Sequence, residues 1–463
     1  MKSLEQFFNP SSVAVIGASN SPFNLGSTIC KVLKEYLNFS GNIYAVNRKG
    51  ENVFGCAGFH AVEEIPGDVD LAVIITPAGV VPGFVRDCGR KGIKNIIIES
   101  AGFSEAGDAG TKMQEEMDGY RREYGLRIMG PNCLGVLNAH AKFCCFYGFG
   151  PSTMGMMSVL LDKPGTISYI IQSGGIGVVI MESFMKEVVS INKMVSIGNK
   201  TDIDEADLVD YFKDDGTEVI GMYLENINDG RKFINSVKRL GKPVLVYKVG
   251  KTAEGARAAM SHTAGMASND VIFDSACRQS GIIRLKSISE LHSMPKIFTS
   301  MPILNGKNIA IFTNSGAFGG ITSDLLVEAG LSIPRLSADT QEKLSRVGQI
   351  FNVSNPIDLG PALSPQIYID IFDILLSAPE VDGLLPVPSI WQPFVIDALD
   401  ELVKMCKKYG KPAAIYTPNS VEKIITTRKE RQIPLFESPE EAVRALQISY
   451  QYGRHINKIK QNV

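Results

Sequence analysis

Short apolar runs alternate with amphipathic stretches along the first third of this chain of 463 residues. The runs are rich in β-branched residues. Continuous apolar runs between helical stretches are typical of parallel strands that are buried on both faces of a sheet. Strands are predicted at 12–16, 42–46, 71–75, 95–98 and 127–129, and a helix at 26–36. This pattern predicts an α/β domain whose parallel sheet is covered by helices on both faces.

The same alternation begins again in the middle third and in the last third of the chain. A strand, a Ser-Gly turn and a helix occur in this order at both 166–190 and 308–329, which favours two related units. Further strands are predicted at 193–197, 219–224, 243–247, 383–387 and 412–416. Polar, proline-bearing stretches near 148–165 and 300–307 are the expected linkers, so we expect domains at 1–150, 151–299 and 300–463.

Composition and charge exclude several classes of partner. The formal net charge is −2 and the pI is about 6.3, so there is no basic field for a nucleic acid. The eight cysteines form no Cys-x-x-Cys pair, and we expect no metal site. The first strand begins too early for a signal peptide, and no apolar run reaches the roughly 18 residues that span a bilayer. Free cysteines fit a reducing compartment. We therefore expect a cytoplasmic protein without a membrane partner.

Residues 248–270 read KVGKTAEGARAAMSHTAGMASND and carry the most informative candidate chemistry. The stretch is small and polar and has no hydrophobic stripe with which to anchor to a core, so it predicts a movable loop. A helix is expected to begin near 268–270. His262 lies in this loop, and an imidazole near pH 7 can act as a nucleophile, a base or a metal ligand. The alternative is a surface loop with an incidental histidine.

Two turns in the first domain are candidate nucleotide contacts. Gly17, Ala18 and Ser19 follow the first strand and resemble a dinucleotide fingerprint without its strict spacing. Asn47-Arg48-Lys49 follows the second strand, where an NAD enzyme would carry a carboxylate. Two cations there suit a ribose phosphate, either of NADP or of coenzyme A, and the alternative is a solvated basic turn.

Other strand ends of the first domain carry polar side chains. Ligands of open parallel sheets bind at the carboxyl ends of the strands. The candidates at these ends are Thr76, Pro77, Glu99 and Ser100. Because no residue in this third offers an acid or base for hydride transfer, we interpret the domain as a binding domain.

A second site is predicted at two helix starts. Gln172-Ser173-Gly174 places backbone N–H groups and a hydroxyl at a helix N-terminus, which favours an anion such as phosphate, and Ser315-Gly316 repeats the arrangement. Either turn alone could be an ordinary helix cap. Glu225 ends a buried strand and is the best partner to support the charge of His262, although a strand-end glutamate can also face solvent.

These residues together resemble the α subunits of the NDP-forming acyl-CoA synthetases, the family of ADP-forming acetate–CoA ligase, which are relatives of succinyl-CoA synthetase. The resemblance covers essentially the whole chain. Its blocks are 13–19, 101–105, 130–135, 172–174, 196–200, 204–207, 261–263 and 355–358.

The resemblance implies a fold and a reaction cycle. The fold would be a Rossmann-like CoA-binding domain followed by two flavodoxin-like, succinyl-CoA synthetase-like domains. Phosphate would attack the acyl carbon of a CoA thioester, and the acyl phosphate would pass its phosphoryl group to His262 on a swinging loop. The loop would then deliver the group to ADP, bound with Mg²⁺ on an ATP-grasp β subunit, usually in an α2β2 heterotetramer.

One stretch departs from the family pattern. Residues 142–147 read KFCCFY where the family usually resembles Asn-Ala-Thr-Phe, and this stretch is a candidate lining of the acyl pocket. Acetate specificity is therefore open, as are the choice of ADP or GDP and the direction of the reaction. Two other functions also stay open at this stage: a non-catalytic CoA-binding regulatory protein of the same fold, and an NADP oxidoreductase.

Overall fold

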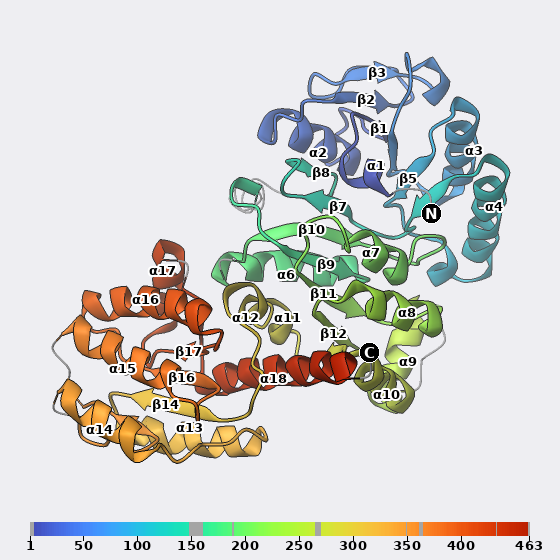
Figure 1. Cartoon of the computed structure of the whole chain (residues 1–463). Helices are drawn as coiled ribbons and strands as arrows, with labels where there is room; N and C mark the ends of the chain where they lie inside the picture. Colours follow the sequence, from blue (N-terminus) through green and yellow to red (C-terminus); the bar gives the residue numbers. More distant parts are fainter. Residues whose placement is uncertain are drawn as a thin grey trace. The chain divides into compact units, whose positions relative to one another are not determined.

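The computed structural model describes residues 4–147, 161–187, 189–263, 270–348, 350–360, 364–431 and 433–461. The chain divides into two compact units (Figure 1). Unit 1 contains Met1–Met185 and Val189–Leu291, and unit 2 contains Lys186–Val188 and His292–Val463. Within the described parts of the chain, every helix is too short or too polar to cross a lipid bilayer.

Unit 1 begins with a six-stranded parallel sheet. The strand order is β3-β2-β1-β4-β5-β6, which is the order of dinucleotide-binding folds. In Figure 1, helix α2 lies on one side of this blue sheet, and α3 and α4 lie on the other. The strands are β1 (Ser12–Ile16), β2 (Asn42–Val46), β3 (Ala57–Phe59), β4 (Leu71–Ile74), β5 (Asn95–Ile98) and β6 (Arg127–Met129). The helices are α1 (Glu5–Phe8), α2 (Leu25–Lys31), which continues as the π-helix η1 (Val32–Tyr36), α3 (Val81–Lys91) and α4 (Asp108–Tyr124). Short 3₁₀ turns are η2 (Val62–Glu64), η3 (Ala78–Val80) and η4 (Ser104–Ala106).

A seven-stranded sheet completes unit 1, in the order β13-β12-β11-β9-β10-β7-β8. Its pairs are parallel except that β7 runs antiparallel to both β10 and β8. The strands are β7 (Gly135–Asn138), β8 (Phe143–Cys144), β9 (Ile167–Ile171), β10 (Ile191–Ser196), β11 (Val219–Leu224), β12 (Val244–Lys248) and β13 (Ile283–Arg284). The helices are α6 (Gly174–Glu187), α7 (Glu205–Tyr211), α8 (Gly230–Leu240), α9 (Ala253–Thr263) and α10 (Asp270–Ser280). Strands β7 and β8 belong to this sheet although they precede the expected boundary near 150.

Unit 2 is built on a parallel sheet of the order β15-β14-β16, which a bridge from Leu384 to Ala413 extends towards the parallel pair β17-β18. The strands are β14 (Ile309–Thr313), β15 (Ile357–Asp358), β16 (Gly383–Val387), β17 (Ile415–Tyr416) and β18 (Leu435–Phe436). The helices from the unit boundary onward are α11 (Ser289–Ser293), α12 (Lys296–Ser300), α13 (Gly316–Glu328), α14 (Ala338–Val347), α15 (Pro365–Ser377), α16 (Pro393–Tyr409), α17 (Val421–Arg431) and α18 (Pro439–Gln461). The predicted α/β class with parallel sheets is confirmed.

The predicted loop at 248–270 is wrong for nearly half of its residues, because 253–263 form helix α9. Alanine has the highest helix propensity, and this segment is rich in alanine. Thr252 starts the helix, since its Oγ1 accepts a hydrogen bond from the N–H of Gly255 at 3.1 Å. Local propensity therefore forms a helix here without a strong apolar stripe. Residues 264–269 lie outside the described residues, and α10 begins at Asp270, close to where a helix was expected.

Candidate active site

A pocket of about 450 Å³ lies within unit 1 where the carboxyl ends of β9, β10 and β11 meet the segment that follows β6. Ligands of parallel sheets bind at such strand ends. Three of the predicted phosphate-binding residues and the predicted partner of His262 line it together. The lining residues are Asn132, Cys133, Leu134, Tyr147, Gln172, Ser173, Gly174, Gly175, Val178, Gly198, Asn199 and Glu225.

The N-terminus of α6 opens into this pocket. The hydroxyl oxygen of Ser173 lies 3.5 Å from the N–H of Ile176, and the carbonyl of Ser173 accepts from the N–H of Gly177 at 3.0 Å. Gly174 is packed against Leu134, whereas a side chain at Gly175 would meet open space. Unpaired N–H groups at the start of a 14-residue helix attract an anion. The site is therefore suited to a phosphate.

Gln172 fixes the position of Glu225. The side-chain carbonyl of Gln172 accepts from the backbone N–H of Glu225 at 2.9 Å and from that of Asn226 at 3.2 Å, and its amide donates to the Asn226 side chain at 2.6 Å. Glu225 is only 8 % exposed. Burial and the charge of Glu225 both raise the pKa of Tyr223. The hydrogen bonds of Gln172 therefore hold the Glu225 backbone in place, so that the Glu225 carboxylate lies in the pocket lining.

Asn199 connects the pocket wall to η4. Its side-chain amide donates to the carboxylate of Glu105 at 2.6 Å. Burial alone would raise the pKa of Glu105, but the hydrogen bonds from Asn199 and from the N–H of Gly102 outweigh it, so this pKa is lowered. Helix α9 is a neighbour of η4 in the fold. The helix that carries His262 therefore lies next to the part of unit 1 that Asn199 joins to the pocket.

His262 lies in the last turn of α9, and its side chain is outside the described part of the structure. Its predicted role therefore stays a prediction. Ser315 and Gly316 lie in unit 2, where Ser315 precedes the first residue of α13 and its N–H donates to Thr313 at 3.1 Å. The acidic Asp358 lies beside this helix start, with Oδ2 3.1 Å from the place of a Cβ on Gly316.

The turn after β1 has the backbone that a nucleotide-binding turn needs. Gly17 has a φ of +102°, and a Cβ there would lie 2.2 Å from the carbonyl oxygen of Ile75, so only glycine fits. Asn24 holds the turn together, because its side chain accepts from Ser19 N–H at 3.1 Å and donates to the carbonyl of Gly17 at 3.0 Å. Asn24 also caps α2. Ala18, between these contacts, is buried.

The turn after β2 presents two cations to solvent. Asn47 is buried, and its side chain accepts from the N–H groups of Lys49 at 3.1 Å and Glu51 at 3.2 Å. Arg48 is exposed and forms no ion pair with the described residues, while Lys49 lies 3.7 Å from Glu51. Asn47 therefore shapes the turn, and Arg48 and Lys49 are the side chains that could meet a phosphate.

The remaining strand-end candidates of the first sheet differ in accessibility. Pro77 is exposed. Ser100 is buried, and its hydroxyl accepts from the N–H of Thr76 at 2.9 Å. Glu99 is 2 % exposed, and burial raises its pKa well above the usual range. A carboxyl group so enclosed does not face the open edge of the sheet.

Several pocket residues were not predicted as site residues. Asn132, Cys133 and Leu134 follow the last strand of the first sheet, and Asn199 follows β10. They belong to two of the blocks that carried the family resemblance, at 130–135 and 196–200, and that was the signal available. Among the described residues, no cluster of His, Cys, Asp or Glu could hold a metal ion.

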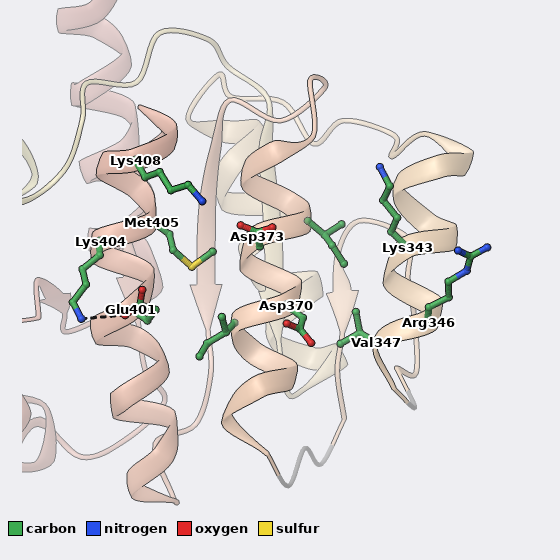
Figure 2. A pocket seen from close by; sticks show the side chains of 11 residues that line it. Lys343, Arg346, Val347, Asp370, Asp373, Glu401, Lys404, Met405 and Lys408 are labelled. Carbon is green, nitrogen blue, oxygen red and sulfur yellow. Dashed lines mark hydrogen bonds and ion pairs between the residues drawn. The ribbon is translucent and has the colours of Figure 1, made fainter.

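A second hollow, of about 750 Å³, lies in unit 2 over α14, α15 and α16 (Figure 2). Its charged residues are largely compensated within the unit. Lys404 pairs with Glu401 at 3.0 Å, Lys343 pairs with Asp339 at 2.6 Å, and Asp373 accepts from the Tyr409 hydroxyl at 2.6 Å. With charges of both signs already paired, this hollow offers less to a charged ligand than the pocket in unit 1.

Comparisons with known proteins assign the class and then the family. Residues 11–139 match the family described as "CoA binding domain", and residues 164–298 match "Succinyl-CoA ligase like flavodoxin domain". These two domains in this order define a CoA ligase of the succinyl-CoA synthetase type.

Full-length relatives narrow this class. The chain is 36 % identical over 464 residues to the α subunit of acetate–CoA ligase [ADP-forming] II of Pyrococcus furiosus, covering 98 % of each chain. It is 34 % identical over 473 residues to the α subunit of isoenzyme I of that organism, covering 99 % of this chain and 100 % of the relative. The chain belongs to the family of the α subunits of ADP-forming acetate–CoA ligases, which are acyl-CoA synthetases.

A solved structure supports the same family. It is the dinucleotide-forming acetyl-coenzyme A synthetase 1 of Ca. Korarchaeum cryptofilum, in complex with phosphate and ADP. The TM-score is 0.89 at 32 % identity, with 100 % of this chain and 99 % of that chain covered. The family resemblance and the fold class predicted from the sequence are confirmed.

Proposed function

We propose that this chain is the α subunit of an NDP-forming acyl-CoA synthetase, which interconverts acyl-CoA, ADP and phosphate with a carboxylic acid, CoA and ATP. The observation that carries the proposal is the pocket in unit 1, which combines the N-terminus of α6 with the carboxylate of Glu225. An anion-binding helix start beside a buried carboxylate suits the transfer of a phosphoryl group to an imidazole. The sequence supplies that imidazole as His262 in the neighbouring helix α9.

The reaction divides into two transfers on this chain. An oxygen of phosphate attacks the acyl carbon of the thioester, the C–S bond breaks, and CoA leaves with the electron pair of that bond. A nitrogen of His262 then attacks the phosphorus of the acyl phosphate, and the carboxylate leaves. N–H groups at Gly174 and Gly175 would hold the phosphate oxygens through both steps.

Glu225 would support the phosphorylated imidazole. A ring that takes a phosphoryl group on one nitrogen keeps a proton on the other, and a carboxylate that accepts this N–H stabilises the cationic ring. Gln172 would hold Glu225 in place through the two backbone hydrogen bonds described above. In a third step, at the partner subunit, the phosphohistidine would give its phosphoryl group to ADP.

CoA would bind along the carboxyl ends of β1, β2, β4 and β5. The turn at Gly17, Ala18 and Ser19 would approach the nucleotide, and Arg48 and Lys49 would pair with a phosphate of CoA. Thr76, Pro77 and Ser100 would line the path of the thioester towards the pocket. This assignment is supported by the match of residues 11–139 to a CoA-binding domain family.

The partner would supply the nucleotide site. The relatives are α subunits of acetate–CoA ligases, which implies a β-subunit partner. We propose that this partner is an ATP-grasp subunit that binds ADP with Mg²⁺, in an α2β2 heterotetramer, and that the complex is cytoplasmic. Ser315 and Gly316 would form a second phosphate-binding helix start. The chain would comprise three domains, at 1–150, 151–299 and 300–463, with β7 and β8 of the first paired in the sheet of the second.

Phosphate transfer to His262 can be tested directly. The complex with the partner is incubated with acetyl-CoA or a longer acyl-CoA and with radioactive phosphate, and acid-labile label on this chain is counted. We expect label in the wild type, none in His262→Ala, and at least a tenfold loss in Glu225→Gln. His140→Ala is the matched control, since His140 is an exposed histidine of unit 1 in the turn between β7 and β8. Full turnover in His262→Ala would contradict the proposal.

A further inference from the structure

Glu99 is a buried carboxyl group that lacks a hydrogen-bond partner among the described residues. It is 2 % exposed, and neither of its side-chain oxygens is hydrogen-bonded to any of them. A buried polar group without a hydrogen bond destabilises the fold, and native structures contain few of them. An aliphatic side chain would fill the same space without this cost. The carboxyl group therefore requires an explanation other than packing.

The carboxyl lies where the chain passes from the first sheet to the second. A Cβ on Gly135, at the start of β7, would lie 2.8 Å from Glu99 Oε1 and 2.6 Å from Cys145 Sγ, so both atoms are packed against the same glycine. Gly135 also has a φ of +96°, which a side chain rarely tolerates. Absence of a side chain at Gly135 therefore leaves room for the carboxyl group.

Glu99 packs against Gly135, the residue that directly follows Leu134 in the lining of the 450 Å³ pocket. Cys133 and Tyr147 line that pocket, and the charge of an ionised Glu99 would raise the pKa of both side chains. The Cys133 thiol donates to the carbonyl of Ile98, the residue before Glu99, at 3.3 Å. Under the proposed function, the start of α6 binds the phosphate and Glu225 supports the imidazole of His262. The part of the pocket that Cys133 and Tyr147 line is therefore available to the acyl group.

The surroundings select the kind of group that Glu99 could bind. Burial is the cause of its raised pKa, and burial favours the neutral carboxyl over the carboxylate. A protonated carboxyl donates one hydrogen bond and accepts others. Among the described residues no cation contributes to the pKa of Glu99, so an anionic substituent would gain no ion pair, and a plain alkyl chain would leave the carboxyl unpaired. A neutral hydroxyl group satisfies it.

We propose that Glu99 is a specificity-determining residue that hydrogen-bonds a hydroxyl group on the acyl chain, so the synthetase prefers hydroxyacyl-CoA over the unsubstituted thioester. This inference rests on the proposed function for the position of the acyl group. Glu99 would reach the substrate between Cys133 and Tyr147 once the acyl chain fills the pocket. A buried site built to pair with a hydroxyl group discriminates strongly against the analogue that lacks it.

Binding of matched thioesters to the full-length chain tests the proposal by isothermal titration calorimetry. The pairs are 4-hydroxybutyryl-CoA with butyryl-CoA, and 3-(4-hydroxyphenyl)propionyl-CoA with 3-phenylpropionyl-CoA. For at least one pair we expect the wild type to bind the hydroxylated member at least about tenfold more tightly. Glu99→Leu should reduce that ratio to within about threefold of unity, and Glu99→Gln, which keeps a donor and an acceptor, should retain part of it.

The controls separate this effect from a general effect on the fold. Thr417→Val removes a buried, unpartnered hydroxyl in unit 2 and should leave the ratio unchanged. Ratios near unity for both pairs in the wild type, or an unchanged preference in Glu99→Leu, would overturn the proposal. If Glu99→Leu does not fold, a crystal structure of the wild type with the tighter thioester decides. A hydroxyl within hydrogen-bond distance of Glu99 supports the proposal, and one elsewhere overturns it.

Failure of the proposed function would give a different result. Thioester cleavage with phosphate and the partner subunit is measured separately from binding. Absence of cleavage with an intact hydroxyl preference would contradict the synthetase function and leave the role of Glu99 standing. Cleavage without any hydroxyl preference would contradict the role of Glu99 and leave the synthetase function standing.

Discussion

Lys200 shows how a single residue can serve both stability and the site. Its side chain is fully buried, and its ammonium donates to the Glu205 carboxylate at 3.0 Å and to the carbonyl of Asn226 at 2.8 Å. Burial raises the pKa of Glu205, and the charge of Lys200 opposes that shift. Because Asn226 follows Glu225 directly, the ammonium also fixes the turn that presents the candidate catalytic carboxylate.

Removal of the Lys200 ammonium should therefore destabilise unit 1. We expect Lys200→Met to lower the free energy of unfolding of unit 1 by about 3–5 kcal/mol, because Glu205 would be left buried and unpaired. The measurement is urea unfolding followed by hydrogen exchange on amides of unit 1. The double variant Lys200→Met with Glu205→Leu should recover more than half of the loss. Equal instability of the single and the double variant would show that the unpaired carboxylate is not the cause.

Residue by residue, the sequence predicted the part of the site that lies at strand ends. Ser173 and Glu225 each follow a strand that is recognisable from its apolar run, and adjacent parallel strands bring them to one pocket. Strand ends did not predict Tyr147 or Cys133. Tyr147 belongs to the stretch 142–147, which the family resemblance named as a candidate pocket lining, and Cys133 was not predicted as a site residue. They lie in irregular segments on either side of β7 and β8, and their approach to the pocket depends on the antiparallel pairing of β7 with β10.

At the scale of elements, the N-terminus of α14 in unit 2 is held by one carboxylate oxygen, Glu380 Oε1, which accepts two hydrogen bonds. Ser337 caps the helix through the N–H of Thr340, and Glu380 Oε1 accepts from the N–H of Ser337 and from the hydroxyl of Thr340, each at 2.8 Å. Burial alone would raise the pKa of Glu380, but these hydrogen bonds outweigh it and lower the pKa to about 2. A carboxylate that is stabilised only in the folded state makes stability depend on pH.

The sign of that dependence can be tested with Glu380→Gln. The folded pKa is below the unfolded one, so the stabilisation is present above the ordinary value of 4.5 and is lost as the pH falls towards 2. We expect the variant to be less stable at pH 7 by up to about 1 kcal/mol, a small value because the group is partly exposed. This difference should shrink from pH 5 to pH 3 in urea unfolding. Glu342→Gln, on the exposed face of α14, is the control. A difference that grows on acidification would contradict the assignment.

Helix α9 shows where the reading of an element from sequence was incomplete. The absence of an apolar stripe predicted a loop, but alanine-rich composition and the cap at Thr252 are sufficient for a helix. Hydrophobic periodicity reports burial of one face, and helix propensity acts independently of burial. The chemistry assigned to His262 does not depend on this distinction.

At the scale of the whole molecule, unit 2 has its own buried ionic cluster. Arg428 is 2 % exposed, and its guanidinium donates twice to the carbonyl of Leu435 and lies 3.2 Å from both Glu187 and Glu437. Lys296 also pairs with Glu187 at 2.6 Å, and burial lowers the pKa of Lys296 to about 8. Such a cluster is stable only while each charge keeps its partners.

We expect Arg428→Met to destabilise unit 2 by about 3–5 kcal/mol, because a carbonyl and two carboxylates lose a buried donor. Hydrogen–deuterium exchange read by mass spectrometry should show faster exchange in α17 and around β18. Peptides from the six-stranded sheet of unit 1 should exchange as in the wild type, since the two units have separate cores. Uniformly faster exchange across the whole chain would contradict independent stability of the units.

By itself, the sequence determined the α/β class, most strands, the family and the candidate residues at helix starts and strand ends. These features follow from local periodicity and from side-chain types at fixed positions along the chain. Only the tertiary structure decided that β7 and β8 join the second sheet, that Gln172 and Lys200 hold the turn of Glu225, and that Glu99 is enclosed beside Gly135 and Cys145. The physical reason is that pairing and enclosure depend on segments distant in sequence, whereas periodicity and propensity act between near neighbours.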